Sequence, residues 1–184
     1  MRCSLTCAFI VMTAFVPRFA AAQTAAPARS ATDITKADID AAVKIGMAAL
    51  APGNVSVSDR NIKLSDSGAY NVAVAFVTRP TTKVPSGRAL SHDKITEIYY
   101  IVRGSGTQVT GPLADATRQA ESTTIGPGYS SASPIAGGRT TRLGPGEMQI
   151  IPPGVGHVWT DIADGGIDYI VVRIDPEHVL ALSK

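Results

Sequence analysis

The sequence is poor in the residues that build covalent cross-links. It contains two cysteines, Cys3 and Cys7, and aromatic residues make up only 5% of its 184 residues. Both cysteines lie within the first 22 residues, a segment that we expect to be removed. The processed chain would then have no cysteine, which excludes disulfide bonds and thiolate catalysis.

Residues 1–22 have the composition of a targeting segment. Arg2 provides a positive start, Leu5 to Val16 form an apolar run, and Ala20 to Ala22 offer small residues for cleavage before Gln23. The apolar run is shorter than the roughly 20 residues that span a bilayer. We therefore expect a signal peptide and a periplasmic or secreted protein with no membrane segment after processing. An uncleaved N-terminal anchor is the alternative.

The sequence also lacks an excess of charge of either sign. Of its 17 Lys and Arg residues, Arg2 and Arg18 fall in the targeting segment, which leaves 15 to balance the 15 Asp and Glu residues. A neutral chain without a basic cluster gives no support to a nucleic-acid partner. Its length suits one domain with a sizeable core.

One helix is predicted, after a flexible leader at residues 23–34 that is small, polar and proline-containing. Thr35 is a candidate N-cap at the start of the single domain, 35–184, and Asp38 completes a capping box. Such a helix packs across a barrel or against a second subunit, or else lines a ligand site. Its apolar residues recur every three or four positions before Pro52-Gly53 ends it: Ile39, Ala42, Val43, Gly46, Met47 and Leu50.

The rest of the sequence favours strands. Residues 70–78 are apolar on both faces, which predicts a strand that is buried on both. Strands of this length with so little helix predict an all-β barrel or sandwich. Further strands are predicted at 60–64, 97–102, 107–110, 147–151 and 167–174, with turns at 104–106 and 164–166.

Residues 111–138 are predicted to form a long loop, because they are rich in glycine, serine, threonine and alanine. Loops of this length are usually functional or disordered. One interpretation is a lid over the barrel mouth, with Arg118, Glu121 or Tyr129 as substrate contacts. A passive surface excursion or a subunit contact is the other.

Two stretches contain two of the three histidines. In the later one, Pro152-Pro153-Gly154 breaks a strand, so a new strand begins near His157 and places Val155, His157 and Trp159 on one face. The third histidine, His178, has no partner pattern and is expected to face solvent.

The earlier stretch contains His92 and Glu97, which are five residues apart. One regular strand would point them to opposite faces, so they converge only if the chain bends at Asp93-Lys94. Glu97, Tyr99 and Ile101 would then share a face. Two imidazoles and one carboxylate could thus meet as the ligands of a mononuclear metal site with open coordination positions.

These two stretches resemble the two motifs of the cupin family. The later stretch matches the second motif at every spacing, and Asp161 stands where asparagine is usual. The earlier stretch matches the end of the first motif, but Leu90 occupies the position of a histidine that the family commonly has. Two spaced motifs in the right order are more specific than either alone. The matching residues are His92, Glu97 and Gly104 in the first motif and Gly146, Pro152, Gly154 and His157 in the second.

The resemblance implies a single cupin-type β-barrel, a double-stranded β-helix or RmlC-like jelly roll, with an N-terminal helix. It implies one divalent metal ion, iron, manganese, nickel or zinc, held by His92, Glu97 and His157, one protein ligand short of the usual set. Tyr99 and Trp159 are candidate substrate contacts on the same faces, or else core aromatics. A homodimer is also expected from the resemblance.

Two hypotheses of different class follow, since the fold does not choose among functions. In the first, the protein is an exported metalloenzyme that acts on a small oxygen-bearing organic molecule, as a dioxygenase, isomerase or lyase. Glu97 is then both a ligand and the candidate catalytic base, and hydrolysis by metal-bound hydroxide fits equally well. In the second, it is a non-catalytic binding protein, and Leu90 marks a degenerate metal site.

Overall fold

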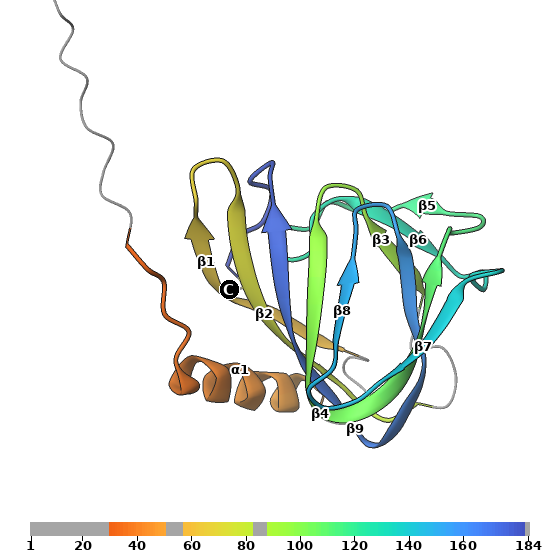
Figure 1. Cartoon of the computed structure of the whole chain (residues 1–184), viewed down its shortest axis with the longest axis horizontal. Coiled ribbons are helices and arrows are strands. Elements are labelled where there is room, and N and C mark those ends of the chain that lie inside the picture. Colours follow the sequence, from red (N-terminus) through yellow and green to blue (C-terminus); the bar gives the residue numbers. More distant parts are fainter. Residues whose placement is uncertain (1–29, 51–56, 83–87, 183–184) are drawn as a thin grey trace, which may run out of the picture. The chain divides into compact units, whose positions relative to one another are not determined.

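Nine strands and one helix make up the described part of the chain, which covers residues 30–50, 57–82 and 88–182 of a computed structural model. The strands form a barrel, and the helix lies against the first two strands (Figure 1). This confirms the predicted all-β class and the cupin-type barrel with an N-terminal helix. In chain order the elements are α1 (Lys36–Ala49), β1 (Ser58–Asp66), β2 (Asn71–Arg79), β3 (Ala89–His92), β4 (Thr96–Gly111), β5 (Thr117–Arg118), β6 (Gly128–Ser131), β7 (Arg139–Leu143), β8 (Met148–Ile151) and β9 (Gly156–Asp175).

The two long strands, β4 and β9, hold the barrel together. They pair antiparallel along their whole length, from Thr96 opposite Ile174 to Gly111 opposite Gly156. In the half of this ladder that contains the start of β4 and the end of β9, β9 also pairs with β2, which pairs with β1, and β4 also pairs with β8. The other half continues into β3, β6 and β5 and, across β4, into β7.

The turns predicted at 104–106 and 164–166 are wrong, because both segments lie inside continuous strands. The β4–β9 register shifts there, which marks irregularities where the ladder bends from one layer to the next. Gly104 and Gly166 both have positive φ, and a Cβ on Gly104 would overlap the carbonyl oxygen of Gly166. Glycine thus bends the strands here without ending them.

The core fills the interior of the barrel. Its centre is a group of aromatic rings, in which Tyr169 lies 4.8 Å from Tyr99 and 5.7 Å from Trp159 between ring centroids. A smaller cluster of Ala73, Ile95 and Leu180 forms where the C-terminal tail packs against the barrel. The other members of the main cluster are Ala75, Val77, Ile101, Leu143, Ile151, Ile162, Ile167 and Val171.

The helix begins as predicted. The Thr35 hydroxyl accepts from the backbone N–H of Asp38, and the Asp38 carboxylate accepts from the N–H of Thr35, so the capping box is present. The helix packs on β1 and β2, where Gly46 leaves room for Ser58.

Among the described residues, no helix is both long and apolar enough to cross a membrane. The predicted targeting segment and most of the leader lie outside the described residues.

Residues 111–138, between the two motifs, contribute a strand to the barrel. The prediction of one loop over the whole of this segment is therefore wrong. Gly128–Ser131 forms β6, which pairs with β3 and places Gly128 opposite His92. A Cβ on Gly128 would overlap the backbone of Ser91, so this strand approaches β3 closely because residue 128 is glycine.

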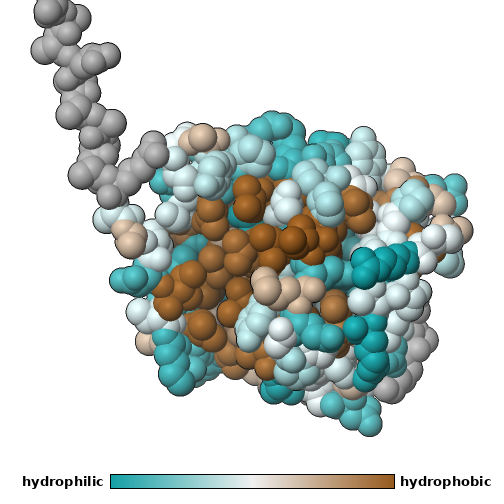
Figure 2. Space-filling model, in the orientation of Figure 1, coloured by the Kyte–Doolittle hydropathy of each residue, from teal (hydrophilic) through white to brown (hydrophobic). Residues whose placement is uncertain are grey.

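One outer face of the barrel is apolar, and Figure 2 shows it as a continuous brown surface. Its side chains form two cross-strand rows over β2, β9, β4 and β8. Residues at the β8 end are the most exposed, with Met148 at 60% and Ile150 at 65%. The rows are Val74, Val172, Ile98 and Ile150, and Phe76, Ile170, Tyr100 and Met148.

Candidate metal centre

The three predicted metal ligands meet inside the barrel. His92 ends β3, the chain bends at Asp93-Lys94 as the odd spacing required, and Glu97 follows near the start of β4. His157 is the second residue of β9. The three side chains are buried, and their ligand atoms lie within 4.8 Å of one another.

The donor atoms converge on one carboxylate oxygen. The Nε2 atoms of His92 and His157 lie 3.5 and 3.6 Å from Oε2 of Glu97. Donor atoms that each bind one ion at about 2.1 Å, at angles between 90° and 120°, lie roughly 3.0–3.6 Å apart. The two nitrogen–oxygen separations therefore fit a small divalent cation.

The outer nitrogens of the two histidines lie in different surroundings. Nδ1 of His157 lies 3.3 Å from the carbonyl oxygen of Val155. A hydrogen bond there fixes the tautomer with its proton on Nδ1 and leaves Nε2 free as a ligand, the usual arrangement in metal sites. Nδ1 of His92 is buried and, within the described residues, has no hydrogen-bond partner.

The second oxygen of Glu97 binds Arg173, a residue that the sequence analysis missed. The Arg173 Nε–H donates to Oε1 of Glu97 at 2.9 Å, while Nη2 donates to Asp59 at 2.5 Å and Nη1 to Asn61 at 2.7 Å. Nη1 also donates to the carbonyl of Thr124 at 3.1 Å. Arg173 therefore orients Glu97 so that Oε2 alone faces the histidines.

Electrostatics keep Glu97 charged and His157 neutral. Burial disfavours the Glu97 carboxylate, but the attraction of His92 and Arg173 outweighs it and lowers the pKa of Glu97 well below its usual range. Burial also lowers the pKa of His157 to about 4, against the opposing effect of Glu97. An ionised carboxylate beside a neutral imidazole is the protonation state that metal binding requires.

The two predicted substrate contacts lie in different surroundings. Tyr99 borders the donor cluster, because its hydroxyl donates to Oε2 of Glu97 at 3.0 Å. Trp159 lies deeper among the core rings, where its Nε1–H donates to the hydroxyl of Tyr169 at 3.3 Å. Both are almost fully buried.

The predicted lid residues do not join this cluster. Arg118 binds Asp93 and lies over the ring of Tyr129, with 5.2 Å between the guanidinium carbon and the ring centroid. Glu121 is exposed and lines a surface pocket with Arg118 and Lys94. His178 is exposed in the tail, as predicted.

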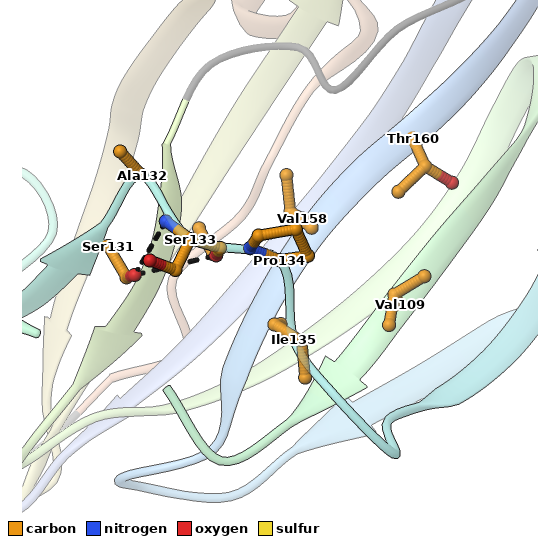
Figure 3. A pocket seen from close by; sticks show the side chains of 9 residues that line it. Val109, Ser131, Ala132, Ser133, Pro134, Ile135, Val158 and Thr160 are labelled. Atoms are coloured by element: carbon orange, nitrogen blue, oxygen red, sulfur yellow. Dashed lines mark hydrogen bonds between the residues drawn. The ribbon is translucent and has the colours of Figure 1, made fainter. Parts of the chain in front are cut away.

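An apolar pocket of about 130 Å³ lies on the outside of the same strands (Figure 3). It is lined by Val109, Val158 and Thr160, which alternate along β4 and β9 with the inward-facing Gln108, His157 and Trp159. Ser131 and Ser133 hydrogen-bond to each other at its rim. The pocket is therefore on the opposite face of the strands from the donor cluster.

Comparison with known proteins finds solved structures of cupin fold, at low sequence identity. No family model matches the sequence, and no curated protein matches it. BH2720 from Bacillus halodurans is 11% identical, with a TM-score of 0.46 over 85% of this chain and 86% of that one. The DMSP lyase DddQ from Ruegeria pomeroyi DSS-3 is 18% identical, with a TM-score of 0.34 over 56% of this chain. FeII HppE is 15% identical, with a TM-score of 0.36 over 56% of this chain. This chain spans 37% of the length of DddQ and 48% of that of HppE.

Proposed function

We propose that this cupin-fold chain is an exported, mononuclear metal-dependent enzyme that acts on a small oxygen-bearing organic molecule, with dioxygenase, isomerase or lyase chemistry. The observation that supports it best is the convergence of two imidazole Nε2 atoms on a single oxygen of a buried, ionised carboxylate. Among the described residues the candidate ligands include no sulfur donor, so iron, manganese, nickel or zinc suits the set.

His92, Glu97 and His157 would hold the metal ion. When bound, such an ion supplies Lewis-acid or redox chemistry at coordination positions that the protein leaves open. The chain contributes the orientation of Glu97 through Arg173, the tautomer of His157 through Val155, and an interior from which water is largely excluded. Low solvent exposure strengthens the electrostatic interactions within the site.

Elemental analysis of the purified chain, without chelators or a polyhistidine tag, tests the proposal. We expect near-stoichiometric metal in the wild type and little metal in His157→Ala, with His178→Ala as the matched control because His178 is exposed. Absence of metal from the wild type, after incubation with iron, manganese, nickel and zinc in turn, would refute metal-dependent catalysis. The identity of the bound metal then limits which reaction types should be tested with hydroxy acids, keto acids and related small substrates.

A non-catalytic binding protein with a degenerate site is the second candidate, and Arg173 favours it. Its guanidinium already neutralises Glu97 from within the fold, so the carboxylate has a cationic partner without a metal. In that case ligands that raise the melting temperature would do so equally in the wild type and in His157→Ala. Under the enzyme hypothesis the same variant would abolish turnover.

Export is the part of this proposal that the sequence supports through residues 1–22. Expression of the full chain in a bacterial host, followed by fractionation and N-terminal sequencing, is the test. We expect protein in the periplasm or medium that begins at Gln23. An intact N-terminus retained in the membrane fraction would favour the uncleaved anchor.

A homodimer is the proposed assembly, formed through the apolar outer face. The two cross-strand rows of that face contain no charged side chain. Uninterrupted apolar patches of this kind are uncommon on monomers and mark interaction sites. A second copy presents the same surface, which suits a two-fold symmetric contact.

A further inference from the structure

We propose that Tyr99 is a fourth protein ligand of the metal ion, through its phenol oxygen. The inference rests on the proposed metal site and gives Tyr99 a role different from the substrate contact expected from the sequence. It would supply the donor that the site lacks where Leu90 replaces a histidine.

The distances carry this inference. The Tyr99 hydroxyl lies 3.0 Å from Oε2 of Glu97, closer than either histidine nitrogen at 3.5 and 3.6 Å. All three separations fall in the roughly 3.0–3.6 Å range expected between donors that share one ion. Within the described residues, the Tyr99 hydroxyl makes no other hydrogen bond that would hold it away from the ion.

The orientation of the ring agrees with the distances. Tyr99 and Glu97 are two residues apart on β4, so their side chains leave the same face of the strand. The Tyr99 ring meets the His157 ring edge-on, at 89° and with 6.2 Å between centroids. Tyr169 stacks against Tyr99 from the core, so the phenol has a fixed direction toward the donor cluster.

Leu90 occupies an inward-facing position that could have held a further donor. It is opposite His157 in the β3–β9 pairing and two residues before His92, so it shares their inward face. A leucine there offers no ligand atom. The Tyr99 hydroxyl approaches Glu97 from β4 instead, which completes a set of two nitrogen and two oxygen donors.

Visible absorption of the ferric protein tests the role of Tyr99, because a tyrosine oxygen bound to ferric iron gives a charge-transfer band that imidazole and carboxylate ligands do not. Wild-type protein is loaded with ferrous iron and oxidised in air. We expect a visible band in the wild type and its loss in Tyr99→Phe. Tyr169→Phe is the matched control, since it removes a buried phenol from the same ring stack and should keep the band.

Metal affinity is the second measurement, made by competition with a chelator. We expect Tyr99→Phe to raise the Kd for iron tenfold or more, but a residue that merely positions Glu97 could have the same effect. The band therefore decides between a ligand and a positioning residue. Wild-type protein that binds iron without the band refutes the Tyr99 proposal and leaves the three-ligand site intact, whereas wild-type protein that binds no metal refutes the site itself.

Discussion

Arg173 shows how one side chain can set the geometry of the whole donor cluster. It is 1% exposed, and its guanidinium bonds to groups from β1, β4 and the segment before β6. Buried charges of this kind are tolerated only when they are paired and hydrogen-bonded. Glu97 and Asp59 therefore depend on Arg173 as much as the metal site depends on Glu97.

Replacement of Arg173 by methionine should destabilise the fold by about 3–5 kcal/mol, because it leaves the buried Glu97 carboxylate and the partly buried Asp59 carboxylate without their cation. Lys36→Met is the control: Lys36 pairs with Asp40 at 2.5 Å on the exposed side of the helix, and an exposed pair of this kind contributes about 1 kcal/mol or less. Urea unfolding at neutral pH measures both. Equal losses in the two variants would contradict the role given to Arg173.

The neutral state of His157 predicts a pH dependence for the metal-free protein. Its pKa is about 4 in the folded chain, whereas an unfolded histidine has a pKa of about 6.5. Between these values the unfolded state binds the extra proton, so stability should fall as the pH drops from about 6.5 to 4, by on the order of 2–3 kcal/mol.

Urea unfolding of chelator-treated protein across that pH range checks this dependence. His157→Gln should show a shallower loss of stability, and His178→Gln should keep the wild-type slope because His178 is exposed. A wild-type stability that stays constant from pH 6.5 to 4 would contradict the prediction.

The donor cluster itself was predictable from the sequence, whereas its counter-ion was missed. His92 and Glu97 are separated by the bend at Asp93-Lys94, and His157 follows the turn at Pro152-Pro153-Gly154; both are local features of the chain. Arg173 appeared to be an ordinary charge in a strand, yet it shares the parity of Tyr169 and Val171, both buried core residues. That parity was a signal for an inward-facing arginine.

At the scale of elements, the prediction succeeded where structure is local and failed where it depends on tertiary packing. The capping box at Thr35 and the bend at Asp93-Lys94 involve neighbouring residues only. Glycine clusters at 104–106 and 164–166 have the composition of turns, but pairing between β4 and β9 converts both into bends of continuous strands. Only the partner strand distinguishes a bend from a turn.

Alanine substitutions can separate the two reasons why position 104 requires glycine, which are its positive φ and the lack of space for a Cβ atom. Gly146 has a similar φ, 84° against 74°, but open space around its Cβ position, so Gly146→Ala should cost about 1–2 kcal/mol from backbone strain alone. Gly104→Ala adds a clash with the backbone of Gly166, and overpacking of this kind costs about 1–3 kcal/mol more. Thermal and urea unfolding measure the difference. Equal effects would mean that β4 and β9 can separate at the bend without loss.

At the scale of the molecule, the apolar outer face is only partly buried within a single chain. The sequence predicted that residues 70–78 are buried on both faces, and Val74 and Phe76 on the outer side of β2 are indeed buried. Across the same sheet, Tyr100, Met148 and Ile150 remain exposed. The burial that the apolar pattern predicts is thus complete at β2 and absent at β8.

A second copy that packs on this face would complete the burial, and charge placed there should prevent it. Ile150→Lys introduces a cation into the most exposed part of this apolar face, so we expect a dimeric wild type and a monomeric variant in light scattering. Tyr70→Lys, in the exposed turn between β1 and β2, should remain dimeric. A standard dimer interface buries roughly 800 Å² on each partner. The melting temperature of a dimeric wild type should therefore rise with protein concentration, whereas the melting temperature of Ile150→Lys should stay the same. A wild type that is monomeric at millimolar concentration would contradict the assembly and indicate that a different apolar partner covers β4 and β8.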